Sequence, residues 1–308
     1  MAAFHPRSGR KRIGFKPAIR SVAAAVLGDA FSQFTIPLAV LRTSDDPEVV
    51  HQVRVGWRRF RSALWLFKPV LADRDWPYEL TALSSLLKLL GELRDLDVAW
   101  HDTLPSLQET YTAGDARRKK AWLSMTQAVR QAAARRRKSV RKVQRNPEVA
   151  AALLATTTWL GTLADGHTDR GVNIEKHVKV LLCRWSERRT ALLQRKLKIA
   201  LKDIGNPDRQ HRLRILAKRM RYSVEALHTL LPQRRAKRWR QQSTDLQMKL
   251  GTARDLKQAS VLVTELEKSP EISAFLRGLA TGLASAETMQ LEKGKRLCLF
   301  DYGIKSVG

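Results

Sequence analysis

The sequence contains little cysteine, few aromatic residues, no long apolar run and few acidic residues. Its two cysteines, Cys183 and Cys298, are far apart and form no CxxC pair. This excludes a disulfide framework or a cysteine-bound zinc site and favours the reducing cytoplasm. The longest apolar stretches fall short of the ~20 residues that a membrane helix needs, so we expect no transmembrane segment. Aromatic residues make up 6% of the chain, which is few for a protein that reads bases by stacking.

Basic residues greatly outnumber acidic ones. The 308 residues include 57 Lys and Arg but only 29 Asp and Glu, which gives a formal net charge of +28. A field of this strength attracts polyanions such as nucleic acid, an anionic membrane surface or a phosphate polymer. Hydrophobic residues make up 44%, which is enough for a packed core and excludes a wholly disordered chain.

The hydrophobic pattern predicts an all-α fold. Apolar positions recur at spacings of three and four, and strand-like alternation is scarce. Proline preceded by Asp, Asn or Ser at Pro47, Pro147 and Pro270 predicts helix starts. Pro37 predicts a helix break instead, and a second break is expected near Pro69 to Pro77. Long helices with short connections are typical of antiparallel bundles.

Two pairs of short motifs repeat along the chain. HQVRVGWRRFR at 51–61 matches HRLRILAKRMR at 211–221, and LGELRDLD at 90–97 matches LGTARDLK at 250–257. Both pairs share one offset of 160 residues. A common offset for two independent matches indicates an internal duplication.

The duplication predicts two homologous halves, each a bundle of roughly four helices. The first half covers residues 15–145 and the second 168–302. Between them, residues 147–164 are expected to form a linking helix. Residues 1–14 are expected to be a basic, flexible N-terminus.

Each repeat carries a row of cations on one helical face, beside a separate apolar face. The stretches 50–71 and 210–224 contain no Asp or Glu. Like charges at helical spacing repel one another, and a bound anion would relieve this repulsion. We therefore favour an anion-binding role for these rows over a face that is merely exposed to solvent. The first cationic row is His51, Arg54, Arg58 and Arg61, and the second cationic row is His211, Arg214, Lys218 and Arg221.

Two further helices add positive charge. Residues 116–145 contain twelve Lys and Arg and no acid. Residues 171–202 also align arginines, but Glu175 and Glu187 dilute the charge, so a solvated face fits equally well there. Arginine predominates, and its planar guanidinium can hold phosphate oxygens through two hydrogen bonds. The candidate ligands are Arg130, Arg137 and Arg141 in the first helix and Arg184, Arg188 and Arg195 in the second.

The histidines and the Arg-Asp pairs of the repeats allow two roles each. His51 and His211 either form structural hydrogen bonds or contact the ligand; ligand contact predicts stronger binding at mildly acidic pH. The carboxylates that follow Leu-Gly are expected to position an arginine of the cationic rows in structural ion pairs rather than to catalyse a reaction. These pairs are Arg94 with Asp95 and Arg254 with Asp255.

No motif for catalysis or metal binding stands out. The chain contains no GxxxxGK[ST] loop, no GxSxG elbow and no HExxH. His101-Asp102 is an isolated HD dipeptide without further metal ligands beside it. The cationic rows contain no carboxylate placed as a general base. We therefore expect a binding protein that is not an enzyme and that uses no metal or cofactor.

The two motif pairs together resemble the CHAD family, whose name refers to a conserved histidine in an α-helical domain. The resemblance covers residues 15–302 and implies two four-helix bundles related by a pseudo-twofold axis, with a basic groove or pore between them. It also implies binding of inorganic polyphosphate, with association of some members with polyphosphate granules. One departure is that residues 271–300 are only weakly basic. The ligand-facing candidates that it implies are the two cationic rows and Tyr222.

The resulting hypothesis is a cytoplasmic protein, located at polyphosphate granules, that binds inorganic polyphosphate in a central basic groove. Sulfate or phosphate ions could take the place of polyphosphate, and nucleic acid could compete with it. One alternative is a helical module that binds the backbone of RNA or DNA. Another is a structural protein that docks its basic face on granules or membranes. The sequence does not determine the oligomeric state.

Overall fold

The computed structural model describes residues 14–71, 78–164, 176–201, 207–266 and 269–295. Within these ranges the secondary structure is helical and no strand occurs, which confirms the all-α prediction. The prediction for residues 1–14 falls outside the described residues, apart from Gly14. Cys298 and the end of the predicted second half also lie outside them.

The first part of the chain contains five long helices. They are α1 (Phe15–Val40), α2 (Pro47–Leu71), α3 (Ser84–Val98), α5 (Ala116–Gln144) and α6 (Pro147–Ala164). Short turns join them: η1 (Tyr78–Leu83), the π-helical η2 (Ala99–Thr103), η3 (Pro105–Leu107) and α4 (Gln108–Thr112). The second part contains α7 (Lys176–Leu201), α8 (Pro207–Ala226), η4 (His228–Leu230), α9 (Gln233–Lys249), α10 (Thr252–Glu265) and α11 (Pro270–Lys295).

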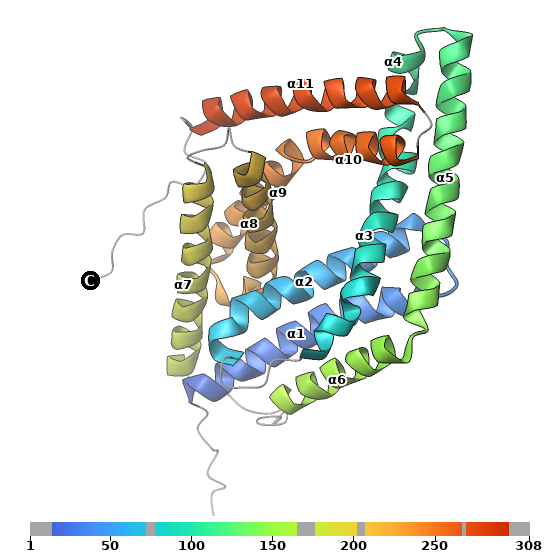
Figure 1. Ribbon diagram of the computed structural model, residues 1–308. Coiled ribbons are helices and arrows are strands. Elements are labelled where there is room, and N and C mark those ends of the chain that lie inside the picture. Colours follow the sequence, from blue (N-terminus) through green and yellow to red (C-terminus); the bar gives the residue numbers. More distant parts are fainter. Residues whose placement is uncertain (1–13, 72–77, 165–175, 202–206, 267–268, 296–308) are drawn as a thin grey trace, which may run out of the picture.

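The helices pack in groups that form the sides of a frame (Figure 1). α1 packs against α2 and α6, α3 against α5, α8 against α7 and α9, and α10 against α11. The two parts of the chain meet where α2 contacts α8, α1 contacts α7, and α3 contacts α10. The helix α6 has the bounds expected of the linking helix. The internal duplication into two four-helix bundles stays a prediction.

The predicted helix starts are confirmed by their capping bonds. The side chains of Asp46 and Asn146 accept hydrogen bonds from the backbone N–H two residues later, at 2.8 and 3.0 Å. Ser269 Oγ accepts one from the N–H of Ile272 at 3.3 Å. Each cap precedes a proline at the first helical position, where the missing N–H costs no helical hydrogen bond.

The helix break predicted at Pro37 is wrong in position, whereas the break predicted near Pro69 to Pro77 agrees with the end of α2 at Leu71. α1 continues to Val40 and α2 to Leu71. Each proline lies in the last turn of its helix, so it removes only one intrahelical hydrogen bond, the one to the carbonyl four residues earlier. The helix tolerates the loss because little of it follows the proline.

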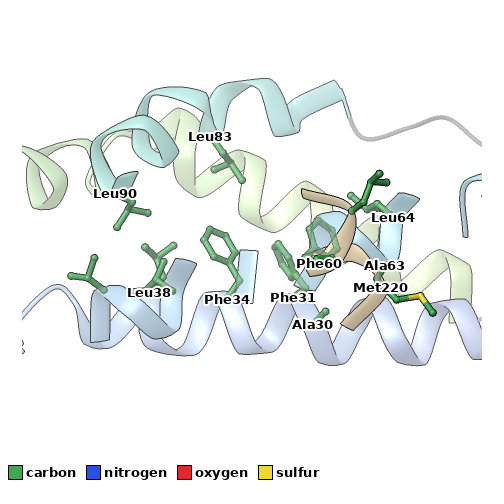
Figure 2. Close-up of a cluster of buried hydrophobic side chains, with 14 of the residues drawn as sticks. Ala30, Phe31, Phe34, Leu38, Phe60, Ala63, Leu64, Leu83, Leu90 and Met220 are labelled. Atoms are coloured by element: carbon green, nitrogen blue, oxygen red, sulfur yellow. The ribbon is translucent and has the colours of Figure 1, made fainter. Parts of the chain in front are cut away.

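One hydrophobic core runs through both parts of the chain. Figure 2 shows Phe31 and Phe34 of α1 beside Phe60 of α2, and the ring centroids of Phe31 and Phe60 are 5.1 Å apart. Met220 of α8 belongs to the same cluster. A Cβ atom on Gly56 of α2 would overlap the backbone of α1, so glycine permits the close approach of these two helices.

By length and composition alone, α1 could span a membrane. The expectation that every apolar stretch is too short is therefore wrong for this helix. Nine of its side chains are buried, and it packs against α2, α6 and α7. A core helix of a folded domain has the same features, so a chain without a transmembrane segment stays a prediction.

Candidate anion-binding site

The first cationic row lies beside the buried face of α2. That face packs into the core as its apolar spacing predicts; Phe60 and Phe67 are fully buried. The row therefore begins at the edge of the core and ends in solvent. Along it, His51, Arg54 and Arg58 are half-buried and Arg61 is exposed.

The second cationic row has the same relation to α8. Arg214, Lys218 and Arg221 are half-buried, whereas His211 is exposed. Tyr222 is buried, and its hydroxyl accepts a hydrogen bond from Arg221 Nη2 at 3.0 Å. Tyr222 therefore orients an arginine of the row instead of presenting its ring to solvent.

The charges of the two rows act on one another around Lys218. Burial and the neighbouring arginines lower the pKa of Lys218 from 10.5 to about 7. Cations from α2, α8 and α10 thus surround one amine, although their sequence positions are far apart. In order of decreasing influence, these arginines are Arg58, Arg214, Arg254 and Arg54.

Cations of both rows also act on His51, the first residue of the first cationic row. Burial and the charge of Arg94 lower the pKa of His51, and Arg58 and Arg221 lower it further. Glu48 opposes this effect. Arg221 belongs to the second row, so residues from both rows lie close to His51. We call the following residues the central cationic cluster: His51, Arg54, Arg58, Arg94, Arg214, Lys218, Arg221 and Arg254.

Several carboxylates accompany this cluster and act on its residues, among them Glu48, Asp95, Asp255 and Glu287. Burial raises the pKa of Asp95, while the charges of Arg254 and Arg54 oppose the rise. Burial and the charge of Arg58 lower the pKa of Arg54, and the charge of Asp95 opposes this lowering. This supports the expected role of Asp95 beside an arginine of the first row, which stays a prediction. It also relates Asp95 to Arg254 of the other repeat motif, which the sequence did not indicate.

The two motif glycines have different surroundings. A Cβ atom on Gly91 would lie 3.0 Å from Arg54 Nη1, so Gly91 leaves room for a guanidinium rather than for another helix. Gly251 precedes the first residue of α10. The second motif thus spans a helix junction where α9 ends, and Arg214 Nη1 donates to the Leu250 carbonyl there at 2.6 Å.

Two arginines of the rows retain unused hydrogen-bonding capacity. Within the described residues, the buried Nε atoms of Arg58 and Arg221 have no hydrogen-bond partner. The Nε of Arg221 is 3.8 Å from Glu225 Oε1, which is an ion-pair contact only. A buried cationic N–H without a partner carries a desolvation cost that an anionic oxygen would remove.

The predicted ligand residues of the basic helix α5 differ in burial and in their contacts. Arg137 is buried, and its Nη2 donates to both carboxylate oxygens of Asp97 at 3.1 and 3.3 Å. Arg130 is exposed and stacks over Trp100, with 5.2 Å from its Cζ to the ring centroid. Arg137 therefore already has an internal anion, whereas Arg130 faces solvent.

Arg141 joins α5 to the segment between α1 and α2. Its Nε donates to the carbonyl of Leu41 at 3.1 Å, and its Nη2 donates to the carbonyl of Ser44 at 2.7 Å. The same Nη2 is 2.8 Å from Asp45 Oδ1. These contacts anchor the start of α2. Ligand contact by the three predicted α5 arginines stays a prediction.

The predicted arginines of α7 are exposed to solvent. Arg184, Arg188 and Arg195 all lie on the outer side of this helix. None of them contributes to the pKa shifts within the central cationic cluster. The structure therefore does not bring them together with the two rows.

An important pair escaped the sequence analysis. Arg59 Nη2 lies 3.4 Å from Glu225 Oε2, and Arg59 Nη1 donates to Gln33 Oε1. Arg59 follows the row residue Arg58, and Glu225 is the first acid after the acid-free stretch of α8. The position of Glu225 was therefore the only hint of this ion pair in the sequence, and the sequence alone does not place α2 next to α8.

The described residues offer no cluster of metal ligands. No group of three or more His, Cys, Asp or Glu side chains among them could hold a metal ion. The chemistry of this region is therefore that of cations with a few interspersed carboxylates. Such a surface can bind anions by charge and by N–H donation.

Comparison with known proteins concerns the family and the fold of the chain. The model of the CHAD domain family matches residues 25–264. The crystal structure of the CHAD domain from the plant Ricinus communis superposes with a TM-score of 0.75 and 25% identity, covering 98% of each chain. PptA from Streptomyces chartreusis gives a TM-score of 0.59 and 14% identity, covering 92% of this chain and 99% of its own. This second similarity concerns the fold alone, and no curated protein matches the sequence.

Proposed function

Because the chain belongs to the CHAD family, we propose that it binds inorganic polyphosphate at the central cationic cluster without catalysing a reaction. The observation that carries the proposal is the position of Lys218, whose pKa is lowered by burial and by arginines from α2, α8 and α10. Cations that are distant in sequence thus share one location. A polymer with one negative charge or more per repeat suits such a location.

A bound phosphate chain relieves the repulsion between the cations of the central cationic cluster. The free protein pays for crowding like charges in a partly desolvated region, and a phosphate chain removes this cost. Binding also releases the counterions of the polyanion. The unused Nε donors of Arg58 and Arg221 can form charge-assisted hydrogen bonds with phosphate oxygens. We propose that these residues line a basic groove and that binding takes place in the cytoplasm, at polyphosphate granules.

The experiment is charge reversal at the centre of the cluster. The double variant Arg58→Glu with Lys218→Glu is expected to abolish polyphosphate binding while the helix content stays unchanged. The control reverses two exposed charges of α5, Arg117→Glu with Lys120→Glu, and is expected to bind nearly as the wild type does. A folded central variant that binds long-chain polyphosphate with wild-type affinity would overturn the proposal.

A competition experiment tests the choice of polyanion. Polyphosphate is compared at moderate salt with duplex DNA, RNA and anionic vesicles at equal phosphate concentration, and it is expected to compete best. Trp57 of α2 is half-buried and packs against the core, with its ring centroid 5.1 Å from that of Phe34, so this packing limits its use as a stacking surface for bases. Equal competition by duplex DNA would favour a nucleic-acid-binding protein instead.

A further inference from the structure

A second group of cations surrounds Trp65, outside the central cationic cluster. Arg189 and Lys196 of α7 and Arg219 of α8 all lie over the indole of this α2 residue. The distances from the charged atoms to the ring centroid are 4.9, 5.4 and 5.4 Å. Two helices thus direct positive charge at one aromatic ring of a third, and the ring attracts cations through its negative faces.

Arg189 has a structural explanation. Pro69 has no N–H, so it cannot donate to the carbonyl of Trp65 within α2. Arg189 Nη2 donates to that carbonyl at 3.0 Å, and its Nε donates to the carbonyl of Leu66 at 3.1 Å. Arg189 therefore completes the last turn of α2 and needs no ligand.

Lys196 and Arg219 have no such explanation. Among the described residues, the only hydrogen-bond, ion-pair or ring contact of either cation is with the indole of Trp65. Lys196 is exposed and Arg219 is half-buried. Burial and the charge of Arg61 lower the pKa of Arg219. The charge of the exposed first-row residue Arg61 therefore repels that of Arg219.

The parts of these three helices around Trp65 contain no carboxylate, although acids such as Glu48, Glu187 and Glu225 occur elsewhere in them. The stretches 49–71, 188–201 and 210–224 each contain five Lys or Arg and no Asp or Glu. In an ordinary exposed helix, acids interspersed at helical spacing offset such charge. Here the stretches of α2, α7 and α8 bring positive charge into one region without acids at helical spacing between them.

Trp65 also continues the first cationic row. His51, Arg54, Arg58, Arg61 and Trp65 follow one another at spacings of three and four, so they share one face of α2. Arg58 and Trp65 are seven residues apart, which is about 10 Å along the helix. A phosphate chain that leaves the central cationic cluster past Arg61 would therefore reach Lys196 and Arg219 next.

We propose that Lys196 and Arg219, held on Trp65, form a second anion-binding site for phosphate groups of a long chain whose other phosphates occupy the central cationic cluster. This inference rests on the proposed function. It adds an outer site that a short phosphate oligomer cannot reach while it is bound at the centre. Chain length then determines how many of the two sites are used.

The test compares inorganic triphosphate with long-chain polyphosphate. The variant Lys196→Gln with Arg219→Gln is expected to bind the long chain about tenfold more weakly, or about 1.4 kcal/mol, and to bind triphosphate as the wild type does. The slope of log K against log salt concentration should shrink by about one to two for the long chain. The matched control is Arg117→Gln with Lys120→Gln, for which no change is expected.

A second readout observes the site directly. Acetylation of the Lys196 amine, followed by mass spectrometry, should slow when long-chain polyphosphate is present and should not slow with triphosphate. An outer variant with wild-type affinity for the long chain, together with unprotected Lys196, would overturn the inference. If triphosphate binding still depends on Arg58 and Lys218 in that case, the proposed function stands alone. A wild-type chain that binds neither polyanion overturns both.

Discussion

Arg59 of α2 and Glu225 of α8 form an ion pair across the two halves of the sequence, with 3.4 Å between Nη2 and Oε2. The other oxygen of this carboxylate is 3.8 Å from Arg221 Nε. One internal acid therefore lies between two arginines beside the central cationic cluster. It holds α2 and α8 together, and it also occupies cations that a phosphate chain could use.

Replacing this acid should affect stability and binding in opposite directions. In Glu225→Gln, we expect the free energy of unfolding to fall by less than about 1 kcal/mol, because the pair is partly exposed. Affinity for polyphosphate should rise, since Arg59 and Arg221 lose their internal anion. Urea unfolding and a binding titration measure the two effects. The control is Glu187→Gln, which removes the exposed ion pair with Arg235 at 3.2 Å; an E225Q protein that behaves like this control in the binding titration would contradict the prediction.

Lys218 should cost the free protein stability. Its pKa falls from 10.5 to about 7 on folding, so the unfolded chain binds more protons between these pH values and stability rises with pH across that range. Lys218→Met removes the amine, and we expect the Tm of the free protein to increase by a few degrees at pH 6. The exposed Lys68→Met serves as the control, and an unchanged or lower Tm of K218M would refute the expectation.

The same amine should make binding depend on pH. A bound phosphate chain favours the protonated amine, so affinity should increase as the pH falls from about 9 to 6 through the lowered pKa of Lys218. His51, whose pKa is also lowered, should extend the increase to more acidic pH. Calorimetry in buffers of different ionisation enthalpy should detect proton uptake near pH 8, and K218M should lose that uptake. Equal uptake in both proteins would assign the protons to other groups.

Gly56 should be indispensable for the packing of α1 on α2. A Cβ atom there meets the Gln33 backbone of α1, so Gly56→Ala should destabilise the protein by about 1–3 kcal/mol or more. A Cβ atom on Gly28 of α1 would meet no heavy atom within 4 Å, and Gly28→Ala should stabilise the protein by about 0.5–1 kcal/mol. Thermal unfolding compares the two, and the same sign of effect for both variants would contradict the packing argument.

Arg137 should matter for folding more than its neighbours on α5. Its partner Asp97 is fully buried, so Arg137→Gln leaves a carboxylate without its cation and should cost about 3–5 kcal/mol. Arg130→Gln, which removes an exposed arginine of the same predicted line, should cost less than about 1 kcal/mol. Denaturant unfolding separates the two outcomes. If R137Q is stable but binds polyphosphate more weakly, Arg137 is a ligand-binding residue and the predicted structural role is wrong.

Local sequence patterns predicted the helices and the faces of α2 and α8. Helical spacing separated Phe60 and Phe67 from the first cationic row, and capping residues ahead of proline gave the starts of α2, α6 and α11. Such features depend on residues within one helical turn. Pro37 was misinterpreted because the cost of a proline depends on how much helix follows it, which the local sequence does not state.

Interactions between distant helices could not be predicted in the same way. Arg137 lies on a line of basic residues that the sequence suggested as phosphate ligands, and only the packing of α3 on α5 places Asp97 beside it. The surroundings of Lys218 depend on where α10 directs Arg254. Charge pattern therefore indicated which helices carry cations, while burial decided which of those cations already have an internal partner.

The bond from Arg189 to the Trp65 carbonyl has a consequence for protein engineering. The last turn of α2 obtains a donor from a helix that begins more than a hundred residues later. A fragment that ends with α6 consequently lacks part of its own secondary structure, and a designer who wishes to split or permute this chain should keep α7 in the same molecule as α2 or supply it as a complementing peptide.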